Sequence, residues 1–148
     1  MATTDFTTTI VVDQTPEEIF NAINNTRAWW SGEIEGSTDK LNDEFTYRYK
    51  DFHLTKQRIV EMIPGKKVVW LVTESHINYA EDKGEWMDTK IIFEIAEQDN
   101  KTALHFTHLG LVPEIECFDS CSNSWNQLIQ QGLLRLITTG KTEKIILA

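Results

Sequence analysis

Hydrophobic and polar positions change their spacing along the chain, and each change predicts a different kind of element. Residues 6–12, FTTTIVV, are rich in threonine and β-branched side chains, which predicts a first strand. Thr15 then precedes Pro16 and two acidic residues, a pattern typical of a helix start with a capping hydroxyl and acids at the positive end of the helix dipole. A second short helix is expected at residues 26–30.

Between residues 33 and 110 the spacing is that of short strands separated by turns. Phe45, Tyr47 and Tyr49 alternate with polar residues, which predicts a half-buried strand with an aromatic inner face. The segment VVWLVT is apolar on both faces, which is typical of a strand at the centre of a sheet. Further strands are expected at residues 52–63, 68–73, 86–96 and 102–109.

Beyond Pro113 the period becomes helical. Apolar residues recur at spacings of three and four from Phe118 to Ile137, which predicts an amphipathic helix of about twenty residues that ends near Gly140. The whole order predicts one α+β domain over residues 1–148, with about six to seven antiparallel strands, two short helices after the first strand, and a long C-terminal helix across the concave face of the sheet.

The net charge of the chain disfavours some classes of binding partner. Lys and Arg total 14 against 23 Asp and Glu, a net charge of -9, which disfavours nucleic acid and anionic membrane surfaces. The N-terminal segment lacks the basic start and apolar run of a signal peptide, so a cytoplasmic protein is expected.

No motif predicts a catalytic, metal or cofactor site. His105 and His108 are three apart on a predicted strand, so they point to opposite faces and cannot share an ion. Cys117 and Cys121 fit small buried thiols better than a metal or redox pair. The chain contains no Gly-x-Ser-x-Gly elbow, although an acid-base role for His108, His53 or a cavity tyrosine stays open.

Four stretches carry a family resemblance: TPEEIF at residues 15–20 with Ala22; Trp29 and Trp30; VEMIP at residues 60–64 with Val68 and Trp70; and Trp125 with Leu128, Leu136, Gly140 and Lys141. In this order they resemble START-like (SRPBCC) proteins, and within them the subgroup named after the activator of the heat-shock protein 90 ATPase. The resemblance implies a helix-grip fold with a cavity between sheet and helix. It also implies, as alternatives, a stress-response role as a chaperone regulator or a cyclase- or hydrolase-type enzyme.

The first hypothesis for function is the binding of an apolar, aromatic or lipid-like small molecule between the sheet and the long helix. A filled core without a usable cavity is the alternative, because protein interiors pack densely. Of the two adjacent tryptophans, Trp30 is expected to point inward and Trp29 to stay partly exposed. The protein is expected to be a monomer or a weak homodimer. The candidate ligand-binding residues are Trp30, Tyr47, Tyr49, Trp70, Met87, Phe93, Phe106, His108, Trp125 and Ile129.

Overall fold

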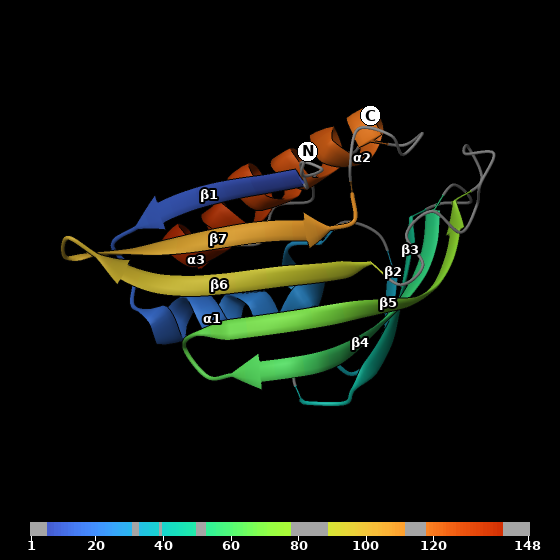
Figure 1. Cartoon of the computed structure of the whole chain (residues 1–148). Coiled ribbons are helices and arrows are strands. Elements are labelled where there is room, and N and C mark those ends of the chain that lie inside the picture. Colours follow the sequence, from blue (N-terminus) through green and yellow to red (C-terminus); the bar gives the residue numbers. More distant parts are fainter. Residues whose placement is uncertain are drawn as a thin grey trace.

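The computed structural model describes residues 6–30, 33–38, 40–49, 53–77, 89–111 and 118–140 of the chain. Within these ranges seven strands form one antiparallel sheet in the order β1-β7-β6-β5-β4-β3-β2 (Figure 1). Their bounds are β1 Phe6–Val12, β2 Glu33–Gly36, β3 Glu44–Tyr49, β4 His53–Ile63, β5 Lys67–Ile77, β6 Lys90–Gln98 and β7 Lys101–Leu109. The strand β5, which contains VVWLVT, lies at the centre of this order, and its central position is therefore confirmed.

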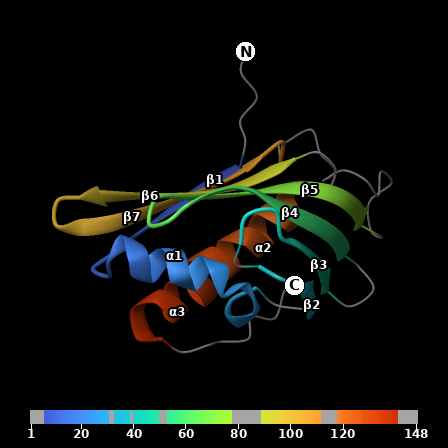
Figure 2. The same cartoon turned by 90° about the horizontal axis from the view of Figure 1, so that it is seen from below.

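All helices lie on one face of the sheet (Figure 2). Helix α1 spans Pro16–Asn24 and is followed by a 3-10 turn, η1, at Thr26–Ala28. The long C-terminal helix consists of α2 (Phe118–Gln127), a π-helical segment η2 (Leu128–Leu133) and α3 (Leu134–Thr139). This arrangement confirms the α+β helix-grip fold. None of the helices in the described ranges is long and apolar enough to cross a membrane.

Helix α1 begins as the sequence predicts. The hydroxyl of Thr15 accepts a hydrogen bond from the backbone N–H of Glu18 at 3.2 Å, and Pro16 occupies the first turn. Its side chains Ile19, Ala22 and Ile23 are buried, and Phe20 is partly buried. The helix therefore covers the sheet with one apolar face, which fixes the position of the chain that follows it.

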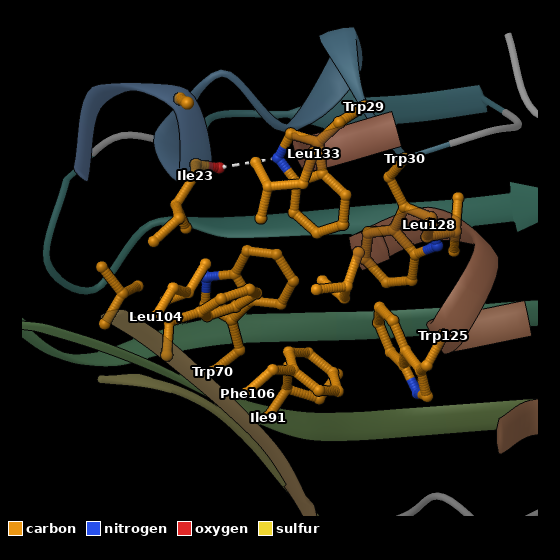
Figure 3. Close-up of a cluster of buried hydrophobic side chains, with 14 of the residues drawn as sticks. Ile23, Trp29, Trp30, Trp70, Ile91, Leu104, Phe106, Trp125, Leu128 and Leu133 are labelled. Carbon is orange, nitrogen blue, oxygen red and sulfur yellow. Dashed lines mark hydrogen bonds between the residues drawn. The ribbon is translucent and has the colours of Figure 1, made fainter. Parts of the chain in front are cut away.

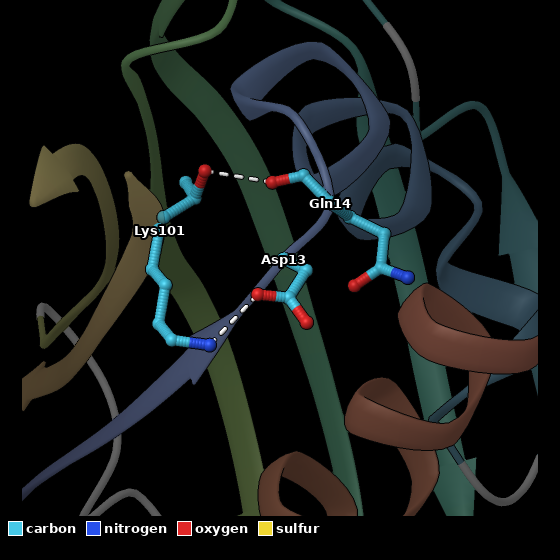
Figure 4. Close-up of polar contacts among 4 residues, drawn as sticks. Asp13, Gln14 and Lys101 are labelled. Carbon is cyan, nitrogen blue, oxygen red and sulfur yellow. Dashed lines mark hydrogen bonds and ion pairs between the residues drawn. The ribbon is translucent and has the colours of Figure 1, made fainter. Parts of the chain in front are cut away.

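The segment between β1 and α1 is held to the start of β7. Lys101 Nζ lies 2.7 Å from Asp13 Oδ1, and the hydroxyl of Thr102 donates to the carbonyl oxygen of Gln14 at 2.7 Å (Figure 4). The ion pair is exposed and contributes little free energy. The buried Thr102 contact is the one that fixes where α1 starts.

Two irregularities in the pairing of β4 with β5 bend the sheet. The register shifts between Lys56 and Gln57 and again between Ile59 and Glu61. Extra residues of this kind increase local twist and bend the strand that carries them. The bend gives the sheet the curvature that Figure 2 shows around the helices.

Candidate functional site

The two adjacent tryptophans both lie in the interior. Trp30 is 3% exposed and stacks on Tyr47 with ring centroids 3.9 Å apart, and its ring lies 5.2 Å from that of Trp125 on α2. This confirms that Trp30 packs inward against the long helix. The expectation that Trp29 stays partly exposed is wrong, because its ring is 1% exposed and stacked against Trp30 and Trp70 (Figure 3).

The short turn after α1 explains this burial. The hydroxyl of Thr26 and the indole N–H of Trp29 both donate to the carbonyl oxygen of Ile23, at 3.0 and 3.2 Å. These bonds satisfy a carbonyl at the end of the helix, where the helix itself offers no partner. They also hold both indole rings in one layer between the sheet and the C-terminal helix.

The structure brings together eight of the ten candidate side chains. A continuous series of ring contacts runs from Trp70 to Phe93 at 4.8 Å, from Phe93 to Phe106 at 5.2 Å, and from Phe106 to Trp125 at 4.7 Å. Met87 and the side chain of Tyr49 lie outside the described residues. The eight buried members are Trp30, Tyr47, Trp70, Phe93, Phe106, His108, Trp125 and Ile129.

One end of this interior is polar. The register of the sheet places the start of β4, the start of β6 and the end of β7 at the same end. The α2 part of the C-terminal helix covers this end, since Trp125 contacts His108. The buried polar residues found there are Thr55, Gln57, Thr89, His108 and Ser122. The opposite end, under α1 and α3, is lined by aliphatic side chains such as Ile19, Leu104 and Ile137.

His108 links the sheet to the helix through both ring nitrogens. Its Nδ1 accepts from the indole N–H of Trp125 at 3.1 Å, and its Nε2 lies 2.8 Å from the hydroxyl oxygen of Thr89. Because the indole nitrogen can only donate, Nδ1 must be unprotonated, and the imidazole proton resides on Nε2. His108 in this geometry donates to Thr89 and so does not act as a base that would activate that hydroxyl.

Two polar atoms at this end have no hydrogen-bond partner among the described residues. They are Oε1 of Gln57, whose amide nitrogen donates to Thr55, and the hydroxyl oxygen of Ser122, one turn before Trp125. Most buried polar atoms in proteins have a hydrogen-bond partner, so each unpaired one is a group to which a bound molecule could form a hydrogen bond.

The sequence analysis did not select Thr55, Gln57, Thr89 or Ser122 as site residues. The signal was present in part, because Thr55 and Gln57 share the inner-face parity of buried Ile59 on β4. The aromatic residues on the same strands gave the stronger signal, and they do not indicate these polar positions.

The described histidines and Cys121 form no metal site. His105 is exposed and bonds Thr9, whereas His108 is buried, which confirms that they lie on opposite faces. No group of three potential metal ligands occurs within the described ranges. Cys121 is bonded in a disulfide, so the prediction of a small buried free thiol at this position is wrong.

An open groove of about 610 Å³ lies apart from the aromatic cluster, at the end of α1. None of the candidate residues lines it. The lining residues are Phe20, Asn21, Asn24, Asn25, Gly36, Ser37 and Thr38.

Comparison with known proteins identifies related families and folds. The family model described as "Activator of Hsp90 ATPase homolog 1-like protein" matches residues 13–137. The search of curated proteins returned no match.

Solved structures share the fold at low sequence identity. The Aha1 dimer from Colwellia psychrerythraea has a TM-score of 0.75 at 21% identity, covering 93% of this chain and 98% of that one. Protein SSP2350 from Staphylococcus saprophyticus has a TM-score of 0.69 at 14% identity, covering 97% and 98%. DynU16, a putative protein in the dynemicin biosynthetic locus, also has a TM-score of 0.69 at 14% identity. The match covers 94% of this chain and 49% of DynU16.

Proposed function

This chain belongs to the family of activator of Hsp90 ATPase homolog 1-like proteins, and from that premise we propose that it binds a small apolar or aromatic molecule that carries one polar group. The ligand lies between the sheet and the C-terminal helix. Its ring packs against aromatic side chains, and its polar group points to the end that holds Gln57 and His108.

The observation that carries this proposal is the pair of unpaired acceptors. Gln57 Oε1 and Ser122 Oγ are buried at the same end of an interior that is lined mostly by rings and aliphatic groups. Small-molecule sites in proteins have this composition, mostly apolar with a few placed polar groups. A hydroxyl or amine on the ligand would donate to one of these oxygens and offset the cost of its burial, about 1 to 3 kcal/mol for each unsatisfied group.

The proposed lining keeps all ten residues expected from the sequence. Trp30, Tyr47 and Trp125 supply ring faces close to the polar end, and the contacts between them would have to open for a ligand to enter. The remaining proposed members are Tyr49, Trp70, Met87, Phe93, Phe106, His108 and Ile129.

A ligand panel tests this function. Fatty acids, sterols and planar aromatic alcohols are added in turn while amide NMR shifts are recorded. We expect at least one class to shift amides of β3, β4, β7 and α2 around the aromatic cluster. Shifts confined to the open groove beside α1, or none with any class, would refute the proposal.

A matched pair of variants locates the polar group. Gln57→Leu keeps the size of the side chain and removes the unpaired oxygen, so it should weaken binding of a hydroxylated ligand. Arg58→Leu changes the neighbouring exposed position on the same strand and should leave the affinity unchanged. Equal effects of the two substitutions would contradict the assignment of Gln57.

The family description favours a second candidate, regulation of a heat-shock chaperone ATPase. The match over residues 13–137 supports it. A pull-down with the chaperone of the source organism, together with its ATPase rate, tests this role. Binding with a changed rate would support it, and the absence of both effects would end it.

A further inference from the structure

Strand β1 forms one edge of the sheet, and within the described ranges no strand pairs with its outer side. The backbone N–H and C=O groups of successive β1 residues point alternately toward β7 and away from it. The N–H of Phe6 bonds Leu111 beyond β7, whereas the carbonyl of Thr9 faces away from β7 and accepts from Gln130 Nε2 at 3.1 Å. By this alternation, Thr7 and Val11 also direct their backbone groups to the outer side.

Apart from the Gln130 side chain, this edge lacks the features that usually prevent pairing with another strand. Sheet edges are commonly protected by charges, proline, bulges or short length. β1 has seven residues, FTTTIVV, with no charge, no proline and an unshifted register against β7. The opposite edge differs, because β2 has four residues and two of them, Glu33 and Glu35, are acidic.

Most of the helix beside this edge is also free of charged residues. Residues 120–134 contain no Asp, Glu, Lys or Arg, in a chain of 148 residues with 37 of them. Asn123, Asn126 and Gln130 are exposed and spaced three and four apart, so they share one helix face. Gln130 bonds β1 from this face, through the hydroxyl of Thr8 and the carbonyl of Thr9. Figure 1 shows the helix running along the β1 side of the sheet.

We propose that the β1 edge and the adjoining amide-bearing face of the C-terminal helix form the surface on which a second copy of this chain docks, with two β1 strands pairing antiparallel. A two-fold axis beside Thr9 sets Thr7 opposite Val11 of the partner subunit. The pairing extends the sheet from one copy into the next and satisfies the outward backbone groups of β1.

Charge favours a second copy at this place. Each chain carries a net charge of -9, so two copies repel each other over most approaches. Two copies repel each other least where the surfaces that meet carry no charge, and the centres of protein interfaces are depleted in charged residues. Thr7, Thr9 and Val11 meet the same uncharged residues in the partner, whereas pairing through β2 would bring Glu33 and Glu35 together.

Gln130 limits this pairing. Its amide occupies the carbonyl of Thr9, which the partner strand needs as an acceptor. The strength of association therefore depends on how readily this side chain releases the edge. The dimer is weak for that reason, and removal of the amide strengthens it.

Sedimentation equilibrium over a wide concentration range tests the proposal with three variants. Val11 is 53% exposed, and Val11→Lys places a charge on the edge; it should raise the dissociation constant about tenfold or more. Val60 is 37% exposed on the interior strand β4, so Val60→Lys makes the same charge change away from the edge and should leave association unchanged. Gln130→Ala should lower the dissociation constant.

Hydrogen exchange gives a second readout that does not depend on variants. At high protein concentration the amides of Thr7, Thr9 and Val11 should gain protection. Those of Thr8 and Ile10, which by the same alternation point toward β7, should be protected at all concentrations. A wild-type protein that stays monomeric throughout, equal effects of Val11→Lys and Val60→Lys, or exchange that does not change with concentration would each overturn the proposal.

Discussion

Replacing Trp30 by alanine removes the ring that touches both the sheet and the helix. A buried tryptophan covers about 150 to 250 Å² of surface. At about 25 cal/mol per Å² this corresponds to roughly 4 to 6 kcal/mol, an upper bound because the unfolded chain already buries part of it. Measured losses for large aromatic-to-alanine changes in cores are about 3 to 5 kcal/mol. We expect Trp30→Ala to lose about 4 kcal/mol and to lower Tm by about 10 °C.

Urea unfolding followed by circular dichroism measures this loss. Leu41→Ala, at a position that is 51% exposed, is the control and should change stability by less than about 0.5 kcal/mol. The space left beside Tyr47 has the shape of an indole ring, since the lost ring stacked there at 3.9 Å. Added indole should therefore restore about 1.4 kcal/mol when its concentration is about tenfold above its Kd. A loss below about 1 kcal/mol, or no response to indole, would refute the described packing.

Two further predictions concern the polar end and the turns. Trp125→Phe removes the donor to His108 Nδ1 and should lower the free energy of unfolding by about 1 to 2 kcal/mol. The imidazole nitrogen NMR shifts should also change. In the wild type these shifts should report a proton on Nε2, and a proton on Nδ1 would contradict the assignment. Gly110→Ala should destabilise more than Gly140→Ala in urea unfolding. Both have positive φ, +103° and +73°, but the new Cβ at Gly110 meets Thr89 Cγ2 at 2.7 Å and the one at Gly140 meets nothing within 4 Å; equal losses would count against the close approach.

The elements that the sequence predicts well are those whose signals are local. The cap at Thr15, the alternation on β3 and the doubly apolar β5 depend on residues close together in the chain, and each is found where expected. The ends of the strands are not predicted by local signals because they depend on how far the neighbouring strand continues. β5 runs to Ile77 because β4 continues beside it as far as His53.

The departures from prediction come from contacts that the sequence does not display. The burial of Trp29 depends on a hydrogen bond to the carbonyl of Ile23, which forms after the helix and turn are in place. The C-terminal helix was expected as continuous α-helix, but it contains the π-helical segment Leu128–Leu133. Apolar spacings of three and four fit both forms, so the pattern alone could not separate them.

The polar end of the interior required three-dimensional information. Gln57 on β4, Thr89 before β6 and Ser122 on α2 lie far apart in the chain, and the antiparallel register together with the helix places them at one end. Their residue types, taken singly, have no specific meaning. Their shared burial beside aromatic rings is what supports a ligand with one polar group.

A comparison of naphthalene with a naphthol tests this account most directly, because the two molecules differ by one hydroxyl on the same ring. Their affinities for the wild type and for Gln57→Leu are measured from intrinsic tryptophan fluorescence. The account predicts that the naphthol binds the wild type about tenfold more tightly, equivalent to about 1.4 kcal/mol, and that Gln57→Leu reduces this preference. Equal affinities of the two molecules for the wild type, or a preference unchanged in Gln57→Leu, would contradict it.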